Sequence, residues 1–258
     1  MSFSTTILRL APLSLATGFS LLAAPSASAQ SEPGPYAVAR AGIQLDADLK
    51  GPKPATVATP ARPGATTPTA IGVLPRNIDA KPGFTGELGM GYDFGGFRLE
   101  GTVGHNTASL NSARLSDRAF AGSGRVKSLD IGVAGYVDFN SEGRLKPFVG
   151  AGIGASRVDL RATRLAVPAT ATTQAQAARI AGTRIRDRDW GLRWHLDAGA
   201  GYELTPTTTL ELAGRYSRTS ALDFTSQNRA TTGGPVVTQT YKPRASSASL
   251  MLGIRQKF

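Results

Sequence analysis

The stretch Trp190–Leu204, WGLRWHLDAGAGYEL, alternates strictly between apolar and polar positions. One parity carries only Trp, Leu, Ala and Tyr, and the other carries Gly together with Arg193, His195, Asp197 and Glu203. Successive side chains of a β-strand point to opposite faces, so this stretch predicts a strand with one apolar and one charged face. A soluble sheet would bury the apolar face. A transmembrane β-barrel turns it toward lipid and keeps the charged face inside.

Seven further segments show the same alternation, and an even number of strands is what a closed single-chain barrel requires. The sequence therefore predicts an all-β protein, an eight-stranded antiparallel transmembrane up-and-down β-barrel. A soluble lipocalin-like barrel is the rival fold. The seven segments are Pro35–Leu49, Gly83–Phe94, Phe97–Thr107, Val126–Phe139, Leu145–Val158, Thr208–Ser220 and Ala245–Phe258.

The connections between these segments alternate in length. Short connections follow the second, fourth and sixth segments, as at Gly95-Gly96. This alternation is typical of bacterial outer-membrane barrels, whose short turns face the periplasm and whose long loops lie outside the cell. We expect residues 30–258 to form one barrel with long extracellular loops. The long connections are residues 50–82, 109–125, 159–189 and 221–243, with approximate ends.

Residues 1–29 have the features of a secretory signal peptide. Arg9 gives a weakly basic start, residues 10–24 are apolar, and Ala27-Ser28-Ala29 has the small-x-small pattern of a cleavage site. The formal charge of +11 would suit a nucleic-acid partner, but export makes such a partner unexpected. The chain has no Cys, which excludes a disulfide scaffold, a Cys-ligated metal and a thiol nucleophile.

Eleven ionisable residues fall on the predicted inward parity of the strands. An isolated charge is expensive to bury, so we expect these residues to pair with one another inside the barrel. They could form a plug that fixes the barrel or line a narrow ion path. The eleven are Glu87, Arg98, Glu100, Asp130, Arg193, His195, Asp197, Glu203, Glu211, Arg215 and Arg255.

The sequence offers weak candidates for catalysis. His195 falls among the inward charges, and His105 falls on the lipid-facing parity without a G-x-S-x-G nucleophile motif. Asp187 and Asp189 flank arginines in a predicted loop and suit a solvated charge run. We therefore expect no catalytic residue, no metal and no cofactor.

Arginines concentrate in and beside the second and third long connections. The outer leaflet of such bacteria is rich in anionic lipopolysaccharide, and guanidinium groups bind phosphate with two parallel hydrogen bonds. One interpretation of these arginines is that they contact this anionic lipid, and the other is that they only keep the loops soluble. The candidate residues are Arg114, Arg118, Arg125, Arg161, Arg164, Arg184, Arg186 and Arg188.

Two motifs resemble the small outer-membrane β-barrel family that includes the opacity-type surface proteins and the OmpA-like transmembrane domain. Residues 145–154, LKPFVGAGIG, resemble that family's KPYVGAGIG strand, and residues 250–258, LMLGIRQKF, resemble its last strand. Gln256 departs from the apolar residue usual there. The resemblance covers roughly Tyr36 to Phe258. It implies that the barrel-insertion machinery reads Phe258 as an assembly signal.

The resemblance also sets the functional expectation, because members of that family serve as surface antigens, adhesins or membrane-stabilising proteins. We expect a non-enzymatic outer-membrane surface protein that supports envelope integrity or surface interaction through its basic loops. Its expected partners are outer-membrane lipid, lipopolysaccharide, and a host or cell-surface ligand. The alternatives are a narrow low-conductance porin for small solutes and, with less support, an outer-membrane lipid or protein hydrolase.

Overall fold

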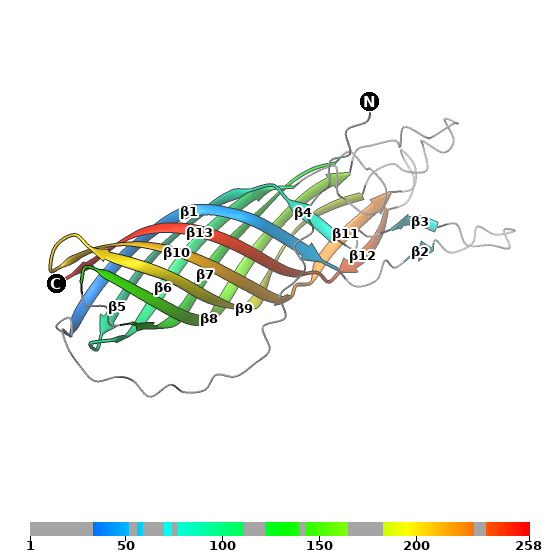
Figure 1. Cartoon of the computed structure of the whole chain (residues 1–258). Helices are drawn as coiled ribbons and strands as arrows, with labels where there is room; N and C mark the ends of the chain where they lie inside the picture. Colours follow the sequence, from blue (N-terminus) through cyan, green and yellow to red (C-terminus); the bar gives the residue numbers. More distant parts are fainter. Residues whose placement is uncertain are drawn as a thin grey trace, which may run out of the picture.

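The computed structural model is an elongated β-barrel (Figure 1). It describes residues 33–51, 56–58, 70–73, 77–110, 122–139, 143–164, 183–229 and 236–258. The predicted signal peptide, residues 1–29, lies outside these ranges. No helix in the described ranges is long and apolar enough to cross a membrane.

Eight antiparallel strands close the barrel, which confirms the predicted fold class. Each strand pairs with its neighbours in the order β1-β5-β6-β7-β8-β9-β10-β13, and β13 returns to β1. The barrel strands are β1 (Gly34–Lys50), β5 (Gly83–Asp93), β6 (Phe97–Ser109), β7 (Gly122–Asp138), β8 (Leu145–Arg164), β9 (Thr183–Glu203), β10 (Thr208–Ala221) and β13 (Arg244–Lys257).

The strand ends that the short connections join lie together at one end of the barrel, and the strand ends that the long connections join lie together at the other. The C-terminus lies at the end with the short turns (Figure 1). Within the described residues, five additional short strands lie at the other end, which we call the loop end. They are β2 (Thr56–Ala58), β3 (Ala70–Val73), β4 (Asn77–Ala80), β11 (Phe224–Arg229) and β12 (Val236–Tyr241).

Three barrel strands run farther toward the loop end than the sequence predicted. β7 begins at Gly122, β8 continues to Arg164, and β9 begins at Thr183, so parts of the predicted loops 109–125 and 159–189 are strand. The prediction stopped too early because the alternation inverts here. Leu160 and Ile185 are buried inside the barrel, while Arg161, Arg186 and Arg188 are exposed on the outer face of the same strands. A strand that leaves the bilayer has water outside it, so its polar side chains face outward.

The predicted loops 221–243 and 50–82 also contain strands. β11 and β12 form an antiparallel hairpin, and β11 additionally pairs with the start of β9 through Ser226 opposite Ile185. β4 pairs with the end of β1, with Ile78 opposite Leu49. The hairpin and β4 therefore extend the wall at the loop end.

A bulge changes the facing of β1 near its end. The register with β13 shifts between Gln44 and Asp46. Strict alternation would have turned Leu49 toward lipid, but after the shift its side chain points inward and is 4% exposed. The bulge thus supplies an apolar side chain to the interior of the loop end.

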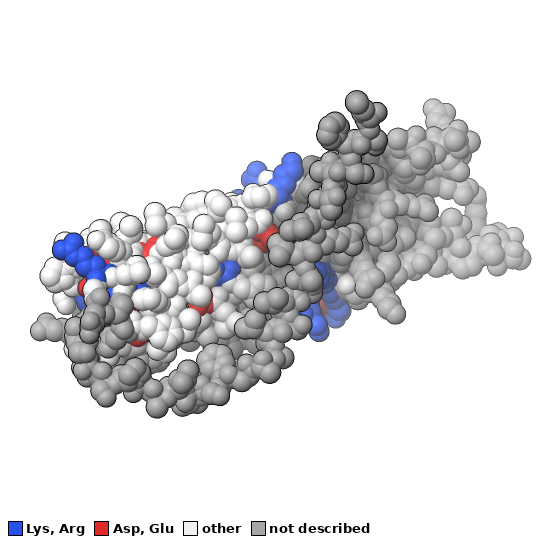
Figure 2. Space-filling view, viewed as in Figure 1, with Lys and Arg blue, Asp and Glu red and all other residues white. Residues whose placement is uncertain are grey.

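The barrel exterior carries a broad band of exposed apolar side chains. In Figure 2 the exterior of the described barrel is mostly white, with few Lys, Arg, Asp or Glu side chains. Large apolar side chains such as Met90 and Leu88 are 72% and 67% exposed. Aromatic residues including Trp190, Tyr202 and Phe94 are also exposed on this surface. A band of this kind is what lipid-facing positions of a membrane barrel require.

Glycines on the inward face make room for large interior side chains. A Cβ atom built on Gly152 would lie 2.5 Å from Nε2 of His195 and 2.9 Å from the carbonyl oxygen of Val133. A Cβ atom built on Gly150 would likewise overlap the ring of Tyr136. The interior of an eight-stranded barrel is only just wide enough for side chains to fill, so these rings need glycine beside them.

Replacing Gly152 by Val is therefore expected to destabilise the barrel by about 1–3 kcal/mol through overpacking. The measurement is the midpoint of guanidinium unfolding in detergent micelles. Gly101→Val is the matched control, because a Cβ there would meet only the carbonyl oxygen of Met90, at 3.9 Å. Equal midpoints for the two variants would contradict the packing argument.

Candidate functional site

Arg40 lies at the centre of a charge network that crosses the barrel interior. Its guanidinium donates to Oε1 of Glu87 at 3.0 Å, to Oε2 of Glu100 at 2.9 Å and to Oε2 of Glu211 at 3.1 Å. All four side chains are at least 96% buried. The single cation thus bridges carboxylates from three other strands.

Arg215 extends the network on the side of β9. It binds Glu87 through Nη2 at 3.1 Å and holds Asp197 by two bonds, from Nε at 2.7 Å and from Nη2 at 2.8 Å. The hydroxyl of Tyr136 also donates to Asp197, at 3.0 Å. Glu87 is therefore shared between two guanidinium groups, those of Arg215 and Arg40.

Arg98 extends the network toward the turn end. It binds Asp138 with a two-pronged contact of 2.7 and 2.8 Å and Glu211 at 3.1 Å. Its guanidinium carbon lies 4.9 Å from the ring centre of Tyr136 and 5.3 Å from that of Phe148. Cation–π contact adds to the ion pairs, so this fully buried arginine is held on several sides.

Two smaller groups complete the interior charges. At the turn end, Nε of Arg255 lies 3.0 Å from Glu211, and Nζ of Lys257 lies 2.7 Å from Asp93. Toward the loop end, Arg193 lies 3.2 Å from Asp130. Hydroxyl and amide groups on β6, β7 and β8 also donate to this Asp130 carboxylate.

The structure brings most of the predicted interior residues together. Glu203 is an exception, because it pairs with Lys146 at 3.3 Å in a partly exposed position away from the central network. His195 is buried, but its Nε2 lies 3.8 Å from Asp197 without a hydrogen bond. Arg40 was missed as the central cation. Its inward parity on β1 was visible, but that strand has the weakest alternation of the eight.

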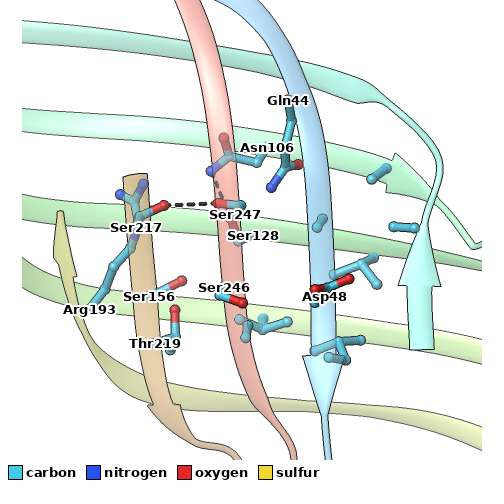
Figure 3. A pocket seen from close by; sticks show the side chains of 17 residues that line it. Gln44, Asp48, Asn106, Ser128, Ser156, Arg193, Ser217, Thr219, Ser246 and Ser247 are labelled. Carbon is cyan, nitrogen blue, oxygen red and sulfur yellow. Dashed lines mark hydrogen bonds between the residues drawn. The ribbon is translucent and has the colours of Figure 1, made fainter. Parts of the chain in front are cut away.

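A cavity of about 60 Å³ with a mixed polar and apolar lining lies between the charge network and the loop end. Figure 3 shows the side chains that line it. Ser217 and Ser247 in its lining are hydrogen-bonded to each other, with their hydroxyl oxygens 2.9 Å apart. A buried water needs roughly 10–15 Å³ and several polar partners, so the cavity has room for a few waters. Its polar lining residues include Gln44, Asp48, Asn106, Ser128, Ser156, Arg193, Ser217, Thr219, Ser246 and Ser247.

Beyond this cavity an apolar cluster fills the mouth of the barrel, and we call it the cap. Phe224 and Leu222 are fully buried in it and come from the last long connection, which folds back over the opening. Burial there raises the pKa of the Tyr241 hydroxyl above its ordinary value. The cap consists of Leu49, Leu110, Val158, Leu160, Ile185, Leu222, Phe224 and Tyr241.

Asp187 and Asp189, which the sequence places in a solvated charge run, also accept hydrogen bonds from the segment that carries the cap residues Leu222 and Phe224. Asp187 accepts from the backbone N–H of Thr225 and Asp189 from that of Asp223, both at 2.7 Å. Burial opposes ionisation of Asp187, but the backbone N–H groups of Thr225 and Arg188 donate to its carboxylate, outweigh the burial and hold its pKa below the ordinary value. Sequence spacing could not show this because the partners lie about 35 residues farther along the chain.

The predicted anionic-lipid residues divide into two groups. Arg114 and Arg118 lie outside the described residues, and Arg164 is described only as the end of β8. The others are exposed, and they stand on strands of the barrel wall and not in loops. These are Arg125, Arg161, Arg184, Arg186 and Arg188.

The remaining candidates are dispersed. His105 faces outward on β6, between Gly86 and Leu129 of the neighbouring strands. Phe258 is 77% exposed at the turn end, and its N–H donates to the carbonyl of Pro35. Within the described residues, no group of three or more His, Asp or Glu side chains is arranged to hold a metal ion.

A family model for the outer membrane protein beta-barrel domain matches residues 14–255 of this chain. The protein belongs to this family, and it is located in the bacterial outer membrane. Its apolar exterior band accordingly contacts membrane lipid. A search of curated proteins finds no match.

Solved structures of similar shape are distant in sequence. Neisserial surface protein A is 17% identical, with 88% of this chain and 99% of that chain covered and a TM-score of 0.44. OprG from Pseudomonas aeruginosa is 14% identical, with 87% and 96% covered and a TM-score of 0.43. The outer membrane protease OmpT from Escherichia coli is 7% identical, with 90% and 99% covered and a TM-score of 0.49.

Proposed function

We propose that this protein is a non-enzymatic outer-membrane surface protein with a sealed interior, which supports the envelope and interacts with other molecules through its outer end. The proposal includes export directed by residues 1–29 and their removal. It places the turns in the periplasm and the loop end outside the cell. Contact with lipopolysaccharide and with a host or cell-surface ligand belongs to the same proposal.

The double closure of the interior is the observation that carries this function. The charge network around Arg40 occupies the membrane-spanning part, and the cap occupies the loop end. Opening the network would separate buried ion pairs, and opening the cap would expose apolar side chains to water. Both layers favour a barrel that serves as a scaffold in the membrane.

Single-channel recording in planar bilayers tests the sealed interior. The refolded full chain is expected to insert without reproducible open steps. A porin recorded in the same membranes is the positive control for detection, and protease protection confirms insertion of this chain. Reproducible conductance steps would defeat the scaffold proposal and favour the narrow pore.

The cavity in Figure 3 is the observation that favours that second candidate, a low-conductance pore for small solutes. A cavity with room for a few waters occupies one section of the interior, and conduction would require both the cap and the charge network to rearrange.

A hydrolase is the third candidate. His105→Ala and His195→Ala should leave every activity of the protein unchanged, and loss of a lipid- or protein-cleaving activity in either variant would defeat the non-enzymatic proposal.

A further inference from the structure

The outer faces of β7, β8 and β9 carry a regular array of basic side chains just beyond the apolar band. The strand register sets them in three rows: Lys127–Asp159–Arg188, Arg125–Arg161–Arg186 and Ser123–Thr163–Arg184. We call the six basic side chains of these rows the basic ladder: Arg125, Lys127, Arg161, Arg184, Arg186 and Arg188. Figure 2 shows Lys and Arg side chains bordering the apolar band near the loop end.

The middle row sets three arginines side by side, and this arrangement opposes folding. Like charges directly opposite each other on neighbouring strands repel. Asp159 is the carboxylate of these rows, and it binds Arg161 at 3.0 and 3.3 Å. Six cations and one carboxylate leave a strong positive excess on an exposed surface. A bound anion would relieve the repulsion between Arg125, Arg161 and Arg186.

Two surface hollows lie within the ladder, one on each side of the Asp159–Arg161 pair. The first, of about 360 Å³, is lined by Arg125 and Lys127 as well as that pair. The second, of about 300 Å³, is lined by Arg186 and Arg188 together with the same pair and by Asp187, whose carboxylate accepts from the backbone N–H groups of Arg188 and Thr225. Each hollow is large enough for a phosphate group and presents it with several cationic donors. The pair of hollows therefore fits a ligand with two anionic groups.

The height of the ladder identifies the source of that ligand. The next row toward the membrane is Leu129–Arg157–Trp190, where the apolar band begins with an exposed Trp. Rows are two residues apart, which at about 3.4 Å per residue and a tilt near 40° gives about 5 Å of height per row. The ladder thus stands about 5–15 Å above the band, in the head-group layer of the outer leaflet.

From the register, the hollows and this height, we infer that the basic ladder binds the phosphorylated head group of an outer-leaflet glycolipid, with one phosphate in each hollow. Arginine suits this site because its planar guanidinium donates two parallel hydrogen bonds to phosphate. This inference rests on the proposed orientation, in which the loop end faces outward. It gives the expected lipopolysaccharide contact a defined location on strands instead of loops.

The test measures binding of fluorescent lipid A to the full chain in neutral detergent micelles. Wild-type protein should bind the form with two phosphates about tenfold more tightly than the form with one, and the form without phosphate more weakly still. The triple variant Arg125→Gln, Arg161→Gln, Arg186→Gln should lose about tenfold or more in affinity for the two-phosphate form.

The matched control removes the same charge from the opposite wall, on β1, β10 and β13, through Lys50→Gln, Arg218→Gln and Arg244→Gln. These side chains are exposed, and the control should bind within about twofold of wild type.

Equal binding of lipid A by the ladder variant and wild type, or an equal loss of affinity in the control, would overturn the site. Displacement of lipid A by millimolar inorganic phosphate, or by heparin more readily than by unlabelled lipid A, would overturn the assignment to a lipid head group. Silent bilayer recordings with failed lipid binding would reject this site and leave the sealed-scaffold part of the proposed function intact.

Discussion

Replacing Arg40 by Met is expected to lower the free energy of unfolding by about 3–5 kcal/mol. The substitution leaves Glu87, Glu100 and Glu211 facing a space that has lost the cation they share. Removing one partner of a buried ion pair strands the other charge, which costs far more than loss of an exposed pair. Arg40→Lys keeps the charge but loses the planar fork, so it should fall between Met and wild type.

Guanidinium unfolding of the barrel in lipid vesicles measures this effect, with tryptophan fluorescence as the signal. Arg218→Met is the control, because it removes an exposed arginine from the outer face of β10. The control should change stability by less than about 0.5 kcal/mol. An Arg40→Met barrel as stable as the control would mean that the three carboxylates do not depend on Arg40.

Replacing Phe224 by Ala is expected to release the cap without unfolding the membrane-spanning part of the barrel. The Phe224 ring is fully buried, and truncation of such a ring typically costs about 3–5 kcal/mol. The lost packing energy weakens the attachment of β11 and the residues just before it. This segment is otherwise held to the barrel by its pairing with β9 and by the carboxylates of Asp187 and Asp189. The free energy of locally opening the cap should therefore fall well below the free energy of unfolding the whole barrel.

Amide hydrogen exchange resolves this effect along the chain. Exchange of the β11 amides should accelerate by about two orders of magnitude or more, while amides in the membrane-spanning part of β10 keep their protection. Leu88→Ala, on the lipid-facing surface, should leave β11 exchange unchanged. If β11 exchange stays slow in Phe224→Ala, packing of that ring does not hold the cap closed.

The fold was predictable because one physical signal recurs in every strand. Lipid outside and charge inside force an alternation that a single sequence displays, most clearly in β9. This alternation of apolar outward and charged inward side chains ends at the edge of the lipid-facing band. The inward-facing Leu160 and Ile185 have apolar side chains on the parity that carries charges deeper in the barrel, so the outer parts of β8 and β9 were mistaken for loop.

The interior residues were predictable as a set but not as partners. Parity placed Glu87, Glu211 and Arg215 inside, yet pairing between strands far apart in sequence depends on register around a closed ring. Arg40 and Glu211 are 171 residues apart in the chain and meet because β13 alone separates β1 from β10. The cap was beyond prediction for a similar reason, since Phe224 reaches the barrel mouth only when the last connection folds back.

The length of the outer wall determines where an external partner can meet this protein. β8 has 20 residues and β9 has 21, whereas about 9–11 tilted residues cross a bilayer. At about 3.3 Å per residue and 40° of tilt, such strands rise about 50 Å, so roughly 20–25 Å stands clear of an apolar band of about 25 Å. The β11–β12 hairpin, which pairs with the start of β9, is therefore held well beyond the apolar band by the extended ends of these strands. In the proposed orientation, with the loop end outside the cell, a molecule on another cell can contact this hairpin without entering the head-group layer.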